Sequence, residues 1–204
     1  MAGPDASPAA DRARRAGTLL TTALDERPHR APNFAAENDA LHHLARALTS
    51  ADGAVLQTLA DMALNLCGAD SAGIGLLERG ADGTTVLRWA ALAGHGTALA
   101  DTIATVEDSP SGIALELGAA QLFSFPQRHF ARLERVISKA VEELVVPIPG
   151  EPEPWGTLWV ISHDEHHRFD AEHRRILTSL ANFTCAALTN AQAKADAEAR
   201  LGGG

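Results

Sequence analysis

The sequence predicts an α+β domain in which one antiparallel sheet, of about five to six strands, has the N- and C-terminal helices packed on one face. Apolar residues recur at helical spacing in two places, within residues 36–68 and after Asp170. Between these segments, short apolar runs alternate with Gly- and Pro-rich turns, as in β-hairpins. Terminal helices that enclose hairpins are typical of the α+β class, because the sheet buries a face against them.

Two helices are predicted before the sheet and a long one after it. Leucines spaced by three and four residues mark one face of a helix over 36–50. A second apolar stripe ends at Gly68, a residue type that closes helices in the left-handed conformation. Asp170 is the expected N-cap of the last helix, which extends to about Arg200.

The sheet is predicted from five strand-like runs. These runs are 71–78, 84–93, 121–125, 143–149 and 156–162. The first two form a hairpin around a four-residue turn, and the last two form a second pair. A short helix over 111–117 is capped by Ser109 or Ser111. Residues 94–110 are the least regular part, and 128–140 form a polar, partly helical connection.

The chain is expected to contain one domain with two tails. Residues 1–32 predict a mobile tail, with a short helix around 17–26, because prolines punctuate a segment that has few large apolar residues. The domain itself is expected over 33–191. Residues 192–204 are expected to be the end of the last helix and a Gly-rich tail.

Charge and hydropathy exclude several classes of partner. The 17 basic and 26 acidic side chains give a formal net charge of −9, which repels a phosphate backbone, so no nucleic-acid partner is expected. No run has the roughly 18 apolar residues of a membrane helix, and the N-terminus lacks the apolar core of a secretory signal. We therefore expect a cytoplasmic protein with no membrane partner. Cys67 and Cys185 are expected to be small buried apolar residues rather than a disulfide.

The C-terminal half carries a family resemblance. The segment ELVVPIP over 143–149, the strand that begins at Gly156 and the pair Phe169-Asp170 before the last helix are similar to the closing part of GAF domains. The opening, with its segment SAGIGLL after two helices, fits the same family. The likeness is closest to the N-terminal sensory GAF domains of bacterial sensor histidine kinases, especially α-proteobacterial ones, which carry a start comparable to 31–41. Ser111 stands where relatives often have a cysteine.

The resemblance implies a pocket between the sheet and the irregular segments 94–112 and 123–130. The expected ligand-binding residues are Trp89, His95, Ser109, Ser111, Phe123, Phe125, His129 and Trp159. Ligand pockets combine apolar walls with a few placed polar groups, and this set supplies both. The alternative is that the aromatic residues are simply core.

No catalytic residue and no metal site is expected. His163, His166 and His167 lie between a predicted strand and an N-cap, which indicates a solvated loop rather than a zinc site. The chain lacks a nucleophile elbow and the paired reactive cysteines of a sulfoxide reductase. A serine at position 111 cannot form a thioether to a bilin, and the sequence identifies no cofactor.

Three functional readings follow. The first is a sensory module that binds a small molecule and relays the signal through its helices to a partner such as a histidine kinase. The second is a ligand-free module that serves dimerisation. The third, a haem- or bilin-binding sensor or an enzyme on the same fold, has the least support. We expect a homodimer built from the helices at 36–50 and 170–200, because the last helix is longer than a small sheet can cover. The chain is either a stand-alone sensor or the sensory part of a longer one.

Overall fold

The computed structural model describes residues 8–49, 54–80, 83–100, 102–130 and 139–202. The α-helices are α1 (Pro8–Arg15), α2 (Ala23–Glu26), α3 (Phe34–Thr49), α4 (Val55–Cys67), α5 (Pro110–Leu117) and α7 (Ala171–Gly202), with 3₁₀ turns η1 (His95–Leu99) and η2 (Pro126–Arg128). The strands are β1 (Ser71–Arg79), β2 (Thr85–Gly94), β3 (Ile103–Thr105), β4 (Gln121–Ser124), β5 (Glu142–Ile148) and β6 (Gly156–Ser162). Most of the polar connection expected over 128–140 falls at 131–138, outside the described residues.

The six strands form one antiparallel sheet in the order β3-β2-β1-β6-β5-β4. This confirms the predicted α+β class and both predicted hairpins. Strand β3 was not predicted, because its three residues are too few to show an alternating pattern. The helix caps follow the sequence: Gly68 ends α4 in the left-handed conformation, and Asp170 Oδ1 accepts hydrogen bonds from the first amides of α7.

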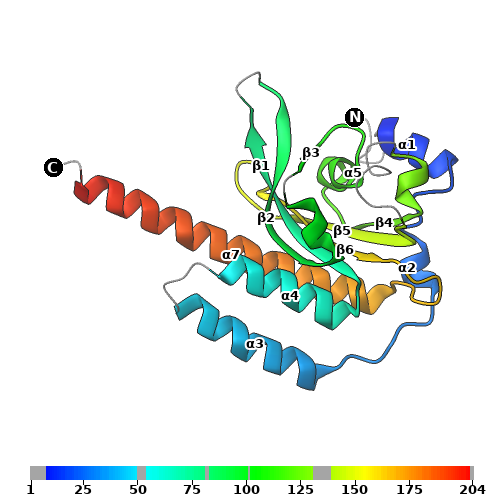
Figure 1. Cartoon of the computed structure of the whole chain (residues 1–204), viewed down its shortest axis with the longest axis horizontal. Coiled ribbons are helices and arrows are strands. Elements are labelled where there is room, and N and C mark those ends of the chain that lie inside the picture. Colours follow the sequence, from blue (N-terminus) through cyan, green and yellow to red (C-terminus); the bar gives the residue numbers. More distant parts are fainter. Residues whose placement is uncertain (1–7, 50–53, 81–82, 101, 131–138, 203–204) are drawn as a thin grey trace.

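Helices cover one face of the sheet and a mixture of elements covers the other (Figure 1). On the first face, α4 and α7 lie side by side against the strands, with α3 outside α4. The strand residues beneath them alternate with residues that point to the opposite face, where α1, α5 and η1 lie. Strands β5 and β6 are buried on both faces, which explains why they read as nearly continuous apolar runs.

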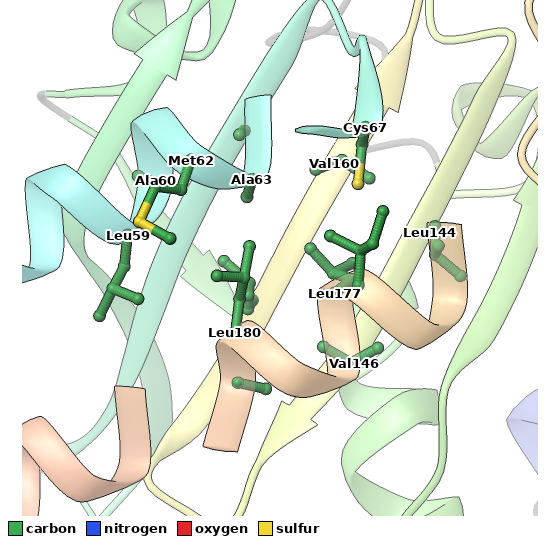
Figure 2. Close-up of a cluster of buried hydrophobic side chains, with 14 of the residues drawn as sticks. Leu59, Ala60, Met62, Ala63, Cys67, Leu144, Val146, Val160, Leu177 and Leu180 are labelled. Atoms are coloured by element: carbon green, nitrogen blue, oxygen red, sulfur yellow. The ribbon is translucent and has the colours of Figure 1, made fainter. Parts of the chain in front are cut away.

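The helix-side core is built from small and branched residues (Figure 2). Residues of α4 pack with Leu177 and Leu180 of α7. Together they cover the strands that carry Val146 and Val160. Cys67 lies fully buried in this layer, and burial raises the pKa of its thiol to about 12. Cys67 therefore acts as a small apolar residue, as expected, while Cys185 is half-buried on α7.

The segment expected as a mobile tail is packed against the domain over the residues that the structure describes, and the short helix expected around 17–26 is found as α2. Residues of this segment form α1 and α2, and Leu19 makes a β-bridge to Phe123 at the edge of the sheet. Leu24 is fully buried in the helix-side core, and two alanines of α1 are buried on the other face. Few apolar residues suffice here, because ion pairs with distant parts of the chain add to their packing.

Those ion pairs attach the N-terminal segment to the start of α7. Arg27 makes a bidentate contact with Glu142 of β5 at 2.7 and 2.9 Å, and it also donates to the Phe169 carbonyl at 2.6 Å. The Phe169 amide donates to the same carboxylate at 2.9 Å. Arg30 donates its backbone amide to Asp170 at 2.9 Å. Glu142 and Phe169 are thereby held next to Arg27, although they lie 115 and 142 positions after it in the sequence.

Removing Arg27 is expected to destabilise the domain strongly. Glu142 is 1% exposed, so Arg27→Ala leaves a buried carboxylate without its main partner and lowers the free energy of unfolding by roughly 3 kcal/mol. The matched control is Arg88→Ala, which removes an equally close contact to Glu78 on the surface, where both side chains are about half exposed. The control is expected to cost about 0.5 kcal/mol. Urea unfolding measures both, and equal losses would contradict the structural role of the Arg27 contact.

Candidate functional site

A cavity of about 100 Å³ lies on the face of the sheet opposite α4 and α7. Its floor comes from β5 and β6 and its walls from β2, η1, β3 and the start of α5. The lining residues are Trp89, Leu99, Thr102, Ile103, Ala104, Thr105, Asp108, Ser109, Pro110, Ser111, Phe130, Glu143, Trp159 and Ile161. Ile103 and Asp108 are exposed and mark the mouth, whereas Glu143, Trp159 and Ile161 are buried at the inner end.

Two glycines leave room for the aromatic wall of the cavity. The Trp89 and Trp159 rings meet edge to face, with centroids 5.7 Å apart. A Cβ on Gly73 would come within 2.4 Å of the Trp159 ring, and one on Gly96 within 3.1 Å. The indole of Trp159 therefore lies where only glycine leaves room for it, across the neighbouring strand β1.

Most polar groups around the cavity already have partners within the protein. Trp89 Nε1 donates to Thr102 Oγ1 at 3.0 Å, and Ser111 Oγ lies 3.1 Å from Thr157 Oγ1. Ser109 is the N-cap of α5, since its hydroxyl accepts from the Gly112 amide at 3.0 Å. Of the two predicted capping serines, Ser109 is the one that the structure uses.

Two buried polar atoms of lining residues lack a hydrogen-bond partner among the described residues. They are Glu143 Oε2 and Trp159 Nε1. Glu143 is 5% exposed, and burial raises the pKa of its carboxyl to about 8. A buried polar group without a partner costs about 1–3 kcal/mol, so two of them in one cavity indicate a place where a ligand could supply partners.

The predicted pocket residues divide into two groups. Trp89, Ser109, Ser111 and Trp159 line the cavity. The other four predicted residues lie outside the lining: His95, Phe123, Phe125 and His129. The Phe123 ring is fully buried against Phe130.

Local geometry explains why the remaining three residues, His95, Phe125 and His129, lie outside the lining. His95 is exposed at the start of η1, and its ring lies 5.5 Å from that of His163. Phe125 has a left-handed backbone at the end of β4, and its ring lies under the Arg128 guanidinium. His129 packs edge to face on Phe130, which is the residue that reaches the cavity. A shift of one residue along an irregular loop changes which side chain lines the pocket.

Glu143 was missed by the sequence reasoning. The available signal was the pair of adjacent glutamates, Glu142 and Glu143, at the start of an otherwise apolar strand. Strand alternation places two neighbours on opposite faces, and both faces of β5 are buried. Two buried carboxyl groups on one strand need either partners or a function.

The histidines after β6 have structural partners. His163 Nε2 lies 3.0 Å from Ser71 Oγ, and its Nδ1 lies 2.7 Å from the Lys139 carbonyl oxygen. His167 packs on the Phe169 ring, and His166 is exposed. Within the described ranges, no group of three or more His, Cys, Asp or Glu side chains is arranged to hold a metal ion.

Comparison with known protein families identifies the family of this chain. The family model of the GAF domain matches residues 50–189. The chain belongs to the GAF domain family. No curated protein matches it. Among its described helices, none is both long enough and apolar enough to cross a membrane.

Solved GAF structures share the fold at low sequence identity. A GAF domain of a phosphoenolpyruvate-protein phosphotransferase from Coxiella burnetii has a TM-score of 0.64 at 18% identity, over 81% of this chain and 99% of that one. The free methionine-R-sulfoxide reductase of Neisseria meningitidis, solved with its substrate, has a TM-score of 0.64 at 20% identity, over 82% and 98%. The GAF domain of a putative sensor histidine kinase from Pseudomonas syringae pv. tomato has a TM-score of 0.56 at 19% identity, over 81% and 94%. These neighbours come from a phosphotransferase, a reductase and a putative sensor kinase, so at this identity they establish the fold alone.

The raised pKa of Glu143 predicts a pH-dependent stability. Between pH 4.5 and about 8 the folded protein keeps a proton that the unfolded chain has released. The stabilisation that this bound proton gives to the folded protein is therefore full below pH 4.5 and is lost as the pH rises through 8. Relative to Glu143→Gln, the wild-type free energy of unfolding is expected to fall by up to about 1.4 kcal/mol per pH unit across this window.

Urea unfolding at several pH values measures this difference. The control is Glu165→Gln at an exposed position after β6, which should follow the wild type at every pH. Parallel curves for wild type and Glu143→Gln would show that Glu143 is already ionised in the folded state.

Proposed function

We propose that this GAF domain is a cytoplasmic sensory module that binds a small molecule in the cavity and is not itself an enzyme. The observation that carries the proposal is a pair of buried atoms, Glu143 Oε2 and Trp159 Nε1, that have no partner within the described part of the chain and belong to residues that line one cavity. The other buried polar atoms without a partner among the described residues are Gln127 Oε1, Arg168 Nη1 and His173 Nε2, and none of these residues lines the cavity. A small molecule that paired these two atoms would recover the free energy that the empty cavity loses.

The relay we propose starts at β5 and ends in α7. Glu143 lies on the face of β5 that lines the cavity, and its neighbour Glu142 lies on the opposite face, where it holds the Phe169 amide and Arg27. Asp170, the next residue after Phe169, caps α7. A ligand that moves the backbone at Glu143 therefore moves the carboxylate that anchors the start of α7.

The output of this relay is proposed to be the long helix. Helix α7 extends well beyond the sheet, and its residues from 189 onward are exposed in the isolated chain (Figure 1). Such a helix suits signalling to a partner, such as a histidine kinase, because two packed arrangements can be biased by a ligand that binds one of them better. The similar putative sensor kinase from Pseudomonas syringae supports this type of partner, and the sequence resemblance to α-proteobacterial kinases agrees with it.

The ligand is tested by native mass spectrometry of the purified protein. We expect the wild type to carry a small-molecule mass and Ala104→Phe to lose it, because a phenyl group on the edge strand β3 occupies the cavity. The matched control is Ala90→Phe, the same change at an exposed β2 position outside the cavity lining, which should keep the ligand. A wild-type protein that never retains a ligand, and that no small molecule stabilises against heat, would favour the ligand-free dimerisation module.

We also propose a homodimer formed by α3 and α7. Leu48 of α3 is 51% exposed and Phe183 of α7 is 39% exposed. Leu41 and Phe183 line one groove that is formed by α3, α4 and α7. Helix α3 packs mainly against α4 and contacts α7 through Glu37 and Arg175, so its outer apolar residues are available to a second copy (Figure 1).

Sedimentation velocity at micromolar concentration tests the dimer. We expect the wild type to sediment as a dimer and the double variant Leu48→Glu, Phe183→Glu as a monomer, because charges at an apolar contact are left unpaired. Thr178→Glu, an exposed change elsewhere on α7, should leave the dimer intact. A monomeric wild type would refute the interface.

A further inference from the structure

The charge of the cavity has one sign. Among the described lining residues, the charged ones are Glu143 at the inner end and Asp108 at the mouth, and none is Lys, Arg or His. Arg12 contacts Asp108 at 3.5 Å from outside the cavity, where both side chains are more than half exposed. An anionic ligand would find no counter-charge among these residues and would face a carboxyl group at the inner end.

The walls of the cavity are aromatic at three positions. Trp89 and Trp159 form one edge-to-face pair, and Phe130 contributes a third ring. Aromatic rings attract organic cations through their quadrupole, and the attraction is larger in a site that excludes water. Aromatic walls around a single buried carboxyl group therefore favour a cation over a neutral molecule of equal shape.

The two unsatisfied atoms define the ligand further. An ionised Glu143 Oε2 accepts from, or balances, a positive group. Trp159 Nε1 is a donor only, so it requires an acceptor atom on the ligand. The volume of about 100 Å³ suits a small molecule, because an engineered cavity of about 150 Å³ holds a benzene molecule.

We propose that the cavity binds a small organic monocation that also carries an acceptor oxygen, with Glu143 as its counter-charge and Trp89 and Trp159 as its aromatic walls. This proposal rests on the proposed sensory function and specifies the chemical class of its ligand.

Burial makes Glu143 suited to exchange its carboxyl proton for a bound cation. Because burial raises the pKa of its carboxyl to about 8, the empty cavity holds a proton there at neutral pH. An incoming cation replaces that proton, which is released to solvent. Asp108, whose side chain is 63% exposed and paired with Arg12, is the other titratable group that lines the cavity in the described chain.

The experiment compares three probes of similar shape in the full-length protein. They are choline, its uncharged carbon counterpart 3,3-dimethylbutan-1-ol, and the anion 3,3-dimethylbutanoate. Choline suits the test because its charge does not depend on pH and its hydroxyl offers an acceptor. Binding is followed through the indole N–H signals in ¹H–¹⁵N correlation spectra, which report on Trp159 directly, with protein first freed of any bound molecule by dialysis.

We expect choline to bind at least about tenfold more tightly than the alcohol and the anion to bind more weakly than either. Between pH 6 and 8 the choline affinity should rise by up to about tenfold per pH unit, because binding requires the ionised carboxyl group. Glu143→Gln should abolish both the preference for the cation and the pH dependence.

Two control variants locate the effect. Glu165→Gln, far along the loop after β6, should leave all three affinities unchanged. Asp108→Asn should lower the choline affinity by no more than about threefold, since that carboxylate is exposed and screened; asparagine also tolerates the positive φ of 52° at this position.

Several outcomes would overturn the proposal. They are an alcohol that binds as tightly as choline, a choline affinity that Glu143→Gln leaves unchanged, a larger loss in Asp108→Asn, and choline that does not bind at all. In each case a ligand retained in native mass spectrometry would still support the sensory function. Absence of any retained ligand together with no response to the probes would refute both.

Discussion

Strand β5 has to bury two carboxyl groups that stand next to each other in the sequence. Because neighbouring residues of a strand point to opposite faces, Glu142 and Glu143 face different cores of the same sheet. Both faces are covered, so neither side chain reaches bulk water. The two faces of the sheet differ in whether the carboxyl group buried there has hydrogen-bond and charge partners.

On the helix side the compensation is complete. Glu142 accepts two hydrogen bonds from Arg27 and one from the Phe169 amide, which joins the N-terminal segment, the sheet and the start of α7 at one carboxylate. A buried carboxylate of this kind contributes little stability on its own but is costly to disrupt, because its partners are desolvated with it. On the other side Glu143 Oε2 has no partner among the residues that the structure describes, and burial raises the pKa of this carboxyl group. Unsatisfied groups of this kind are expected at functional sites, where stability is lost for the sake of binding.

The sequence predicted what depends on local periodicity and missed what depends on distant contacts. The helices, their caps at Gly68 and Asp170 and both hairpins follow from apolar spacing and turn residues within short windows. The packing of residues 8–27 depends on a bridge from Leu19 to Phe123 and on Arg27, whose partners lie more than a hundred residues away. Trp89, Trp159 and the two serines at the start of α5 line the cavity, whereas His95, Phe125 and His129 lie in turns whose backbone angles no periodicity encodes.

The adjacency of the two glutamates also limits how a signal can leave the cavity. A ligand shifts a conformational equilibrium only through a difference in its affinity for the two states. At Glu143 that difference is available, since a cation stabilises the ionised carboxyl group and the empty cavity favours the protonated one. The two forms differ in charge next to the peptide that joins Glu143 to Glu142, whose carboxylate is fixed by Arg27 and Phe169. In the relay that we propose, movement of β5 reaches the residues that begin α7 through this carboxylate. The same carboxylate holds the N-terminal segment through Arg27, so the proposed relay would include that segment together with the start of α7.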